Sequence, residues 1–195
     1  MSRDIWISSD FHLGHENILK FKDSKTGKLV RGDKFSSVDE MDEYILERHN
    51  KMVKPGDIFY TLGDVFIGDK ENFKKMWPKF NGSKRLIVGN HDKVDWLSSG
   101  GFFKKVQIWR KFPEFGLILT HIPLHISSMY NHSNDSYLYG IHGHIHQHNS
   151  PVGPYKNVCV EKTDYTPVHI ETLAAEAKEY FDSQWDEDKK ILNIK

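Results

Sequence analysis

The stretch Leu86-Ile87-Val88-Gly89-Asn90-His91-Asp92 joins a short apolar run to four residues that suit neither a core nor a helix. The apolar run predicts a buried strand, and the glycine that follows it predicts a turn where the strand ends. An amide, an imidazole and a carboxylate held in such a turn can bind a ligand or move a proton. The stretch therefore predicts a strand whose far end belongs to a functional site.

Four other short apolar runs also end in residues that bind metals. Open α/β sheets bind ligands at the carboxyl ends of their strands, so we expect these residues to gather at one edge. They are Asp10 and His12 after Ile5-Trp6-Ile7, Asp64 after Ile58-Phe59-Tyr60, His121 after Leu117-Ile118-Leu119, and His144 with His146 after Leu138-Tyr139.

Each of these motifs is weak when it is taken singly. Gly63-Asp64 is also an ordinary turn, because both residue types favour turns for backbone reasons. A lone His121 near an apolar run is more often a buried, hydrogen-bonded histidine than a metal ligand. His144 and His146 alternate, which puts both imidazoles on one face of an extended segment. That pattern suits a metal, but it also arises by chance in a histidine-rich stretch.

The order of the apolar patterns predicts an α/β protein with two mixed sheets packed on each other. A capping box at Ser37–Glu40 starts a helix that should stop at Pro55, and Val106–Trp109 with Leu117–Thr120 has the signature of a hairpin. The polar segment 24–33 is predicted to be exposed. The other predicted helices are 15–21 with Phe21 inward, 72–80, 92–98 and 173–181, and the strands are 4–8, 58–62, 84–88, 137–141, 157–160 and 168–170.

Composition limits the classes of protein that this chain can be. A length of 195 residues, with 38% hydrophobic residues, predicts one globular domain, 1–181, followed by a polar tail, 182–195. Lys+Arg 27 against Asp+Glu 27 gives no bulk positive charge for a nucleic acid. No apolar run approaches membrane-spanning length and no signal region is evident, so with one cysteine we expect a reducing cytoplasm.

Taken together and in order, the motifs resemble the signature of the calcineurin-like metallophosphoesterases. The opening Asp10–Asn17 looks like that of small bacterial and phage members. The resemblance implies a four-layer αββα sandwich, two mixed sheets flanked by helices. Cys159 stands where a glycine is expected, which would alter packing without touching the metals. The matching blocks are Asp10-Phe11-His12, Gly63-Asp64, Gly89-Asn90-His91-Asp92, His121 and Gly143-His144-Ile145-His146, with further likeness in 53–57 and 157–160.

The same resemblance implies two divalent metal ions bridged by the Asp64 carboxylate. Oxygen and imidazole ligands suit first-row metals, so we expect Mn²⁺ first, with Fe²⁺, Ni²⁺ and Zn²⁺ as alternatives. One metal would be held by Asp10, His12, Asp64 and His146, and the other by Asp64, Asn90, His121 and His144.

The resemblance also implies roles in catalysis. A metal-bridging hydroxide would attack the phosphorus and His91 would protonate the leaving group, with Asp92 orienting its ring or stabilising its charged form; a merely supporting role for His91 stays open. Substrate contacts are predicted for Asn90, His15, Asn17 and His125, and for the last three a solvated role is equally open. The roles of His142 and His148 are also open.

The sequence therefore predicts a dinuclear-metal phosphohydrolase. A phosphodiesterase acting on a small nucleotide-like phosphate ester is the first expectation. The alternatives are a phosphomonoesterase or protein phosphatase, a nuclease, and a metal- or phosphate-binding module without turnover. The balanced charge offers no basic track for a polymer, and no membrane partner is expected.

Overall fold

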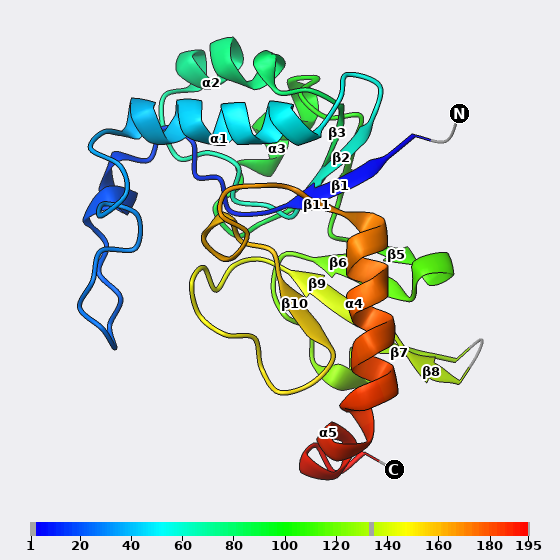
Figure 1. Ribbon diagram of the computed structural model, residues 1–195. Coiled ribbons are helices and arrows are strands. Elements are labelled where there is room, and N and C mark those ends of the chain that lie inside the picture. Colours follow the sequence, from blue (N-terminus) through cyan, green and yellow to red (C-terminus); the bar gives the residue numbers. More distant parts are fainter. Residues whose placement is uncertain (1–2, 133–134, 195) are drawn as a thin grey trace.

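The computed structural model describes residues 3–132 and 135–194 and contains two large mixed sheets (Figure 1). The first has the order β11-β1-β2-β3-β4, in which β1 to β4 are parallel and β11 is antiparallel to β1. Its strands are β1 (Ile5–Ser8), β2 (Ile58–Thr61), β3 (Ser83–Ile87), β4 (Lys105–Gln107) and β11 (Val168–His169).

The second sheet has the order β10-β9-β6-β5, with only the β5–β6 pair antiparallel. Its strands are β5 (Trp109–Phe112), β6 (Leu117–Thr120), β9 (Tyr139–His142) and β10 (Tyr155–Asn157). A small hairpin, β7 (Tyr130–Asn131) with β8 (Ser136–Tyr137), stands apart from both sheets.

The predicted hairpin around Pro113 is only partly right. β5 and β6 do pair, but Lys105–Gln107 belongs to the first sheet. The chain therefore crosses from one sheet to the other at Ile108, whose side chain is 77% exposed. The sequence pattern does not reveal this crossing, because the residues of β4 and those of β5 have the same strand-like pattern and follow each other almost without a break.

Helices cover the face of the first sheet that points away from the second. Met41 and Ile45 of α1, Phe73 of α2 and Leu97 of α3 share a core with Phe59 of the sheet and its neighbours. Ser37 caps α1 by accepting from the Glu40 amide, as the capping box predicts. The elements here are η1 (Glu16–Lys20), α1 (Val38–Met52), α2 (Lys70–Met76), η2 (Trp77–Lys79) and α3 (Val94–Ser99).

The second core lies between the two sheets. Ile7 and Tyr60 of the first sheet share it with Phe112 and Ile141 of the second, and the rings of Tyr60 and Phe112 meet edge to face. Helix α4 (Ile170–Ser183) joins this core and contacts β1 and β11. The expected α/β fold with two mixed sheets and flanking helices is confirmed (Figure 1).

The end of the chain is not a solvated tail. Residues Trp185–Ile191 form a helix, α5, and Trp185 is buried in the core between the sheets, against Tyr137 and Phe181. The charge run predicts a solvated tail, but it hides Trp185, and one of its acidic residues, Asp188, is half-buried and accepts a hydrogen bond from Tyr180. One large aromatic side chain is enough to anchor it.

Two predictions about the segment 15–33 are wrong. Phe21 is 51% exposed, because the predicted helix is a single 3₁₀ turn that ends at Lys20. The polar segment 24–33 hides a fully buried cation, Arg31. Three more 3₁₀ turns, η3 (Pro113–Phe115), η4 (Ile126–Met129) and η5 (Val160–Lys162), complete the described elements. Among those elements, no helix combines the length and apolarity needed to cross a bilayer.

Candidate metal centre

Six of the predicted ligands meet in two groups at the carboxyl ends of the central strands. Asp10, His12 and His146 form the first group, and the second consists of Asp64, His121 and His144. Within each group the candidate ligand atoms all lie within 4.8 Å of one another. Segments from β1, β2, β6 and β9 supply these side chains, as the pattern of strand ends predicts. Their binding of metal stays a prediction.

Asp64 lies between the two groups. Its Oδ2 atom is 3.7 Å from Nε2 of His12 in the first group and 3.6 Å from Nε2 of His121 in the second. The seventh predicted ligand, Asn90, reaches the second group, with its Oδ1 atom 2.8 Å from Nε2 of His121. A carboxylate with an imidazole on either side is an arrangement that can bridge a pair of cations.

Several buried atoms in the first group lack any hydrogen-bond partner. Oδ1 of Asp10 and Nε2 of His12 are buried and unpaired in the described structure. Unpaired buried polar atoms are costly, and native proteins rarely keep them without a bound ion or water. Nε2 of His146 lies 3.9 Å from the same Asp10 oxygen. These oxygen and imidazole donors fit a divalent metal ion.

His146, His121 and Asp10 each use their other polar atom in a hydrogen bond within the protein, whereas Nδ1 of His12 is buried without one in the described structure. Nδ1 of His146 donates to Oε1 of Glu161 at 2.8 Å, and Nδ1 of His121 donates to the Leu62 carbonyl at 2.7 Å. Oδ2 of Asp10 accepts from the Ser9 hydroxyl at 2.5 Å and from the His144 amide at 2.9 Å. Such bonds fix the ring orientation and tautomer, leaving the second atom of each group free for a ligand.

The backbone carries strain at these residues. Asp10, His12, Asp64, His144 and His146 all have positive φ values, between 50° and 70°. Residues other than glycine rarely adopt this conformation, and it persists only where the surrounding structure enforces it. Five of the seven predicted ligands share it, which is a strong sign that the turns are built to aim these side chains.

Close packing of the turns explains two of the motif glycines. A Cβ atom on Gly89 would lie 2.3 Å from Oδ1 of Asp64, and one on Gly143 would lie 2.3 Å from Oδ2 of Asp10. No side chain fits in either place, so a glycine lets each turn approach a ligand carboxylate directly.

The pKa shifts of Asp10, His12 and His144 suit metal binding, whereas that of His146 does not: burial lowers the pKa of His146, but the Glu161 carboxylate outweighs it and raises that pKa. Burial raises the pKa of Asp10, but the imidazoles of His12, His146 and His121 outweigh it and hold that pKa well below its ordinary value. Burial lowers the pKa of His12, and burial with the nearby His121 lowers that of His144. A carboxylate and neutral imidazoles are the forms in which these side chains bind metals.

Asp92 hydrogen-bonds backbone amides, so in the described structure it does not orient the His91 ring by a direct hydrogen bond. Its two oxygens accept from the backbone amides of Gly89, Asp64 and Val65, at 2.8 to 3.1 Å. These hydrogen bonds connect the loop after β3 to the loop after β2 and occupy both oxygens of the carboxylate. Asp92 positions Asn90 and His91 through the backbone, which the sequence could not reveal.

His91 and His15 both lie next to the first group. The ring centroid of His91 is 5.8 Å from that of His12, and the centroid of His15 is 5.7 Å from it. His91 is exposed and its amide donates to Oδ1 of Asp64 at 2.9 Å. Burial, with the charge of His12 next in size, lowers the pKa of His15 to about 4. Both rings therefore border the candidate metal centre.

The other predicted substrate contacts are not brought to the ligands. Asn17 is exposed on η1, where its side chain accepts from Lys20, and Nδ1 of His125 caps η4 by accepting from the Ser127 amide. Nδ1 of His142 bonds the Gly143 carbonyl and its Nε2 bonds Ser150, so this buried ring is structural. His148 is exposed, 3.8 Å from Asp23.

Sequence reasoning missed a buried ion pair beneath the first group. Arg31 donates to Oε1 of Glu161 at 2.8 Å and to the Asp10 and Phe11 carbonyls at 2.6 and 2.8 Å. Burial raises the pKa of Glu161, but Arg31 and His146 overcome it and lower that pKa to about 2. The pair therefore supports both Asp10 and His146. An arginine in a polar segment gave no signal of this.

Cys159 comes closer to the site than expected. Its Sγ atom donates to Oδ2 of Asp10 at 3.2 Å, so the thiol contacts a predicted ligand rather than only filling space. Burial, with the nearby Asp10 and Glu161 carboxylates, raises the pKa of the thiol well above its ordinary value. The protonated thiol is the form that can donate this bond.

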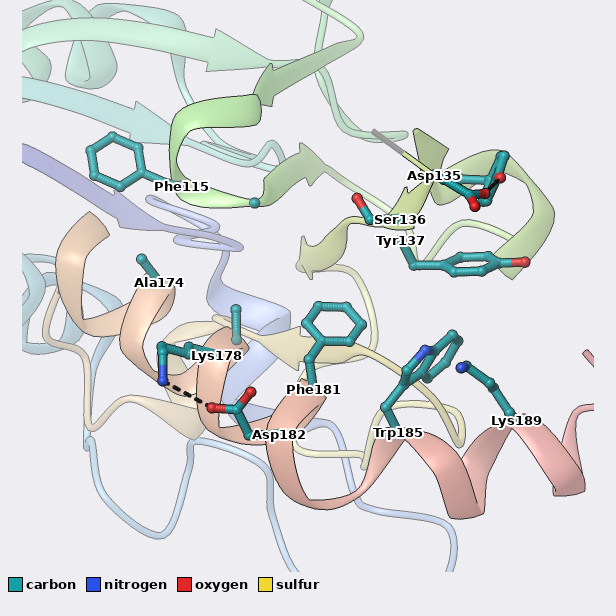
Figure 2. A pocket seen from close by; sticks show the side chains of 13 residues that line it. Phe115, Asp135, Ser136, Tyr137, Ala174, Lys178, Phe181, Asp182, Trp185 and Lys189 are labelled. Atoms are coloured by element: carbon teal, nitrogen blue, oxygen red, sulfur yellow. Dashed lines mark hydrogen bonds and ion pairs between the residues drawn. The ribbon is translucent and has the colours of Figure 1, made fainter. Parts of the chain in front are cut away.

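A cavity of about 780 Å³ lies elsewhere, between the small hairpin and helices α4 and α5 (Figure 2). Tyr137, Phe181 and Trp185 line it, and Lys178 pairs with Asp182 at 2.9 Å near its edge. None of the residues that line it is a predicted site residue. It is therefore separate from the candidate metal centre.

Comparison with known proteins adds relatives whose activity is not described by their names. No family model matches the chain. "Uncharacterized protein MJ1445" of Methanocaldococcus jannaschii is 29% identical over 180 residues, covering 88% of this chain and 89% of that protein. The "Gene 66 protein" of Mycobacterium phage L5 is 28% identical over 90 residues, covering 45% of this chain and 39% of the phage protein.

One solved structure resembles the whole fold. The crystal structure of the protein of unknown function AQ665 from Aquifex aeolicus matches with a TM-score of 0.66 at 24% identity. The match covers 88% of this chain and 98% of that chain. The likeness extends to nearly all of both proteins, and at this level of identity it concerns the fold.

Proposed function

We propose that the chain is a dinuclear-metal phosphohydrolase of the calcineurin-like type, acting on small phosphodiesters of nucleotide-like size. The observation that carries the proposal is the position of Asp64. One oxygen of this carboxylate lies 3.7 Å from His12 and 3.6 Å from His121, between two groups of metal-type ligands. Single-metal sites have no need of a carboxylate shared in this way.

Bound there, two divalent ions would lower the pKa of a water molecule to make a nucleophile and would neutralise charge on a phosphate. The residues present account for the ligands. Asp10, His12 and His146 would hold one ion, while Asn90, His121 and His144 would hold the other, with Asp64 common to both. Mn²⁺ is the first expectation, and Fe²⁺, Ni²⁺ and Zn²⁺ suit the same donors.

The protein's own side chains would then bind the phosphate ester and donate a proton to its leaving group. With two divalent ions bound, their charges would outweigh the carboxylates of Asp10 and Asp64, so the site would be positive and would attract an anion. His91 is exposed beside His12, where its ring can donate a proton to the oxygen of the leaving alcohol. Asp92 holds the backbone of this loop and so keeps His91 in place.

The test is a panel of phosphate esters on protein reconstituted with Mn²⁺, with metal content measured in the same samples. Bis(p-nitrophenyl) phosphate and p-nitrophenyl phosphate release the same alcohol, so they compare a diester with a monoester directly. We expect two metals per chain and faster turnover of the diester. Preference for the monoester would favour a phosphomonoesterase or protein phosphatase instead.

Two further outcomes separate the remaining alternatives. Turnover of DNA or RNA that falls steeply with salt would favour a nuclease. Two bound metals with no turnover of any ester would favour a metal- or phosphate-binding module. For localisation we propose a reducing cytoplasm, because the single cysteine is buried and has no other cysteine to pair with.

A further inference from the structure

A cavity of about 600 Å³ opens next to the candidate metal centre, where the chain crosses from the first sheet to the second. Asn90 and His121, both predicted ligands of one metal, line one side of it. Its volume lies within the range of small-molecule binding sites. Most of the remaining wall is apolar, made by Val88, Ile108, Trp109, Ile118, Ile122 and Leu124.

This wall exposes large apolar side chains to an unusual extent. Ile108 is 77% exposed, Trp109 51% and Ile122 48%. In the described part of the chain seven large hydrophobic side chains are exposed, and three of them line this one cavity. Apolar side chains gathered at a cavity beside polar ligands are typical of a binding site rather than of scattered surface residues.

The cavity and His91 border different ligand groups, which bears on which ester group of a bound phosphodiester the cavity would hold. His91 lies beside His12 in the first ligand group, whereas the cavity borders His121 and Asn90 of the second. A phosphodiester bound across both groups has two ester groups. With one of them beside the acid at His91, the cavity that borders the second ligand group is available to the other, which stays on the phosphate.

We infer that this cavity, the retained-group pocket, binds the ester group that stays on the phosphate, and that it selects a planar ring such as an aryl group or a nucleobase. Trp109 supplies an indole ring on which a planar group can stack, although the Lys111 ammonium lies 5.4 Å from the centroid of that ring, and Ile108 and Ile122 add apolar surface to the same wall. This inference rests on the proposed phosphohydrolase function. It also explains a preference for diesters, since a monoester has no second group to bind here.

Two substrates with one leaving group test the pocket. Methyl p-nitrophenyl phosphate and phenyl p-nitrophenyl phosphate both release p-nitrophenol, so they differ only in the retained group. With Mn²⁺-loaded wild-type protein we expect kcat/KM for the phenyl ester to exceed that for the methyl ester by about tenfold, the size of an aromatic contact. A ratio near one would overturn the inference and leave the proposed function standing.

Matched variants identify the side chains that select the ring. Trp109→Ala and Ile108→Ala should each lower the phenyl-to-methyl ratio by at least threefold. Ile191→Ala removes the same kind of side chain at a similar exposure, 65%, far along the chain on α5 and outside this pocket, and should keep the wild-type ratio. Ile108 is so exposed that its variant should fold normally. Wild-type ratios in both pocket variants would contradict the inference.

Binding measured without turnover separates the two proposals. Calorimetry with diphenyl phosphate and dimethyl phosphate should show tighter binding of the diphenyl compound to the wild type, by about tenfold, and loss of this difference in Trp109→Ala. That result with no turnover of any ester would support the pocket and contradict the proposed hydrolase. Equal binding of both compounds would refute the pocket whether or not the protein turns over.

A second copy of the chain is the other possible occupant of this surface. Sedimentation of the wild type, Ile108→Ala and Ile191→Ala decides between the two. We expect the same mass for all three. If Ile108→Ala alone dissociates a dimer and leaves the phenyl-to-methyl ratio unchanged, the apolar wall is an interface between copies and the inference is wrong.

Discussion

Nδ1 of His146 donates a 2.8 Å hydrogen bond to Oε1 of Glu161, and the same oxygen accepts from the buried Arg31. The bond leaves Nε2 of His146 directed at Oδ1 of Asp10, 3.9 Å away. A carboxylate that holds a histidine by its far nitrogen fixes the ring and makes it a better metal ligand. Glu161 therefore belongs to the candidate metal centre although it does not reach the ligand atoms.

Replacing Glu161 by glutamine should weaken binding at the first ligand group. The amide keeps the shape but loses the charge that pairs with Arg31 and His146, so we expect about a tenfold loss of Mn²⁺ affinity for one of two sites. Calorimetric titration would measure it. Glu176→Gln, which breaks only the surface pair with Lys156, is the control and should bind two ions as the wild type does. Equal affinities in both variants would remove Glu161 from the site.

Removing the ring of His91 should affect substrates according to their leaving group. An alkyl leaving group needs a proton, so His91→Ala should lower its turnover by about 100-fold, whereas release of p-nitrophenol, a good leaving group, should fall much less. Metal content should stay unchanged. His148→Ala, the loss of another exposed histidine, controls for surface effects. Equal losses on both substrates would mean that His91 does not act as the acid.

A methyl group on Gly89 should disrupt the turn that carries Asn90 and His91. Its Cβ would lie 2.3 Å from Oδ1 of Asp64, so either the turn or the shared carboxylate must move. We expect Gly89→Ala to lose metal and to cost about 2 kcal/mol in the free energy of unfolding, as overpacking does. Gly56→Ala, where nothing lies within 4 Å, is the matched control. Thermal unfolding and metal analysis of both variants would show whether the contact matters.

Asp42 should make the protein less stable as the pH rises. Burial raises its pKa from 3.8 to about 7, so the folded state keeps a proton that the unfolded state releases. The free energy of unfolding therefore falls between about pH 4 and pH 7, by roughly 4 kcal/mol at most, and stays low above that range.

Denaturant titration from pH 5 to pH 8 would measure this effect. Asp42→Asn cannot ionise, so its free energy of unfolding should rise relative to the wild type across this range. Glu43→Gln, an exposed acid on the same helix, should follow the wild type. Parallel curves for the wild type and Asp42→Asn would show that Asp42 titrates normally.

The ligands could be predicted from the sequence because each follows an apolar run directly. Strand ends in an α/β sheet meet at one edge, so Asp10, Asp64 and His121 were placed by their local pattern alone. Most strands and helices were found in the same way. The sequence does not predict that the chain passes from the first sheet to the second at Ile108, because two consecutive strands in different sheets look like one continuous strand.

The supporting residues could not be predicted in this way. Arg31 and Glu161 are 130 residues apart in the chain, and neither follows a strand or belongs to a repeated pattern. Asp92 was read as a partner of His91 because the two are adjacent, but its carboxylate turns to backbone amides. Contacts that depend on tertiary folding leave no local signal, and the substrate contacts expected of His125 and Asn17 stay predictions.

The shared position of Asp64 is tested most directly by counting metals in Asp64→Asn and Asp10→Asn beside the wild type. After reconstitution with Mn²⁺ and removal of free metal, elemental analysis should give two ions per chain for the wild type, and paramagnetic resonance should show them spin-coupled. Asp10→Asn should keep about one uncoupled ion, whereas Asp64→Asn should lose both. One ion or none in the wild type, or two uncoupled ions that survive Asp64→Asn, would contradict the dinuclear centre.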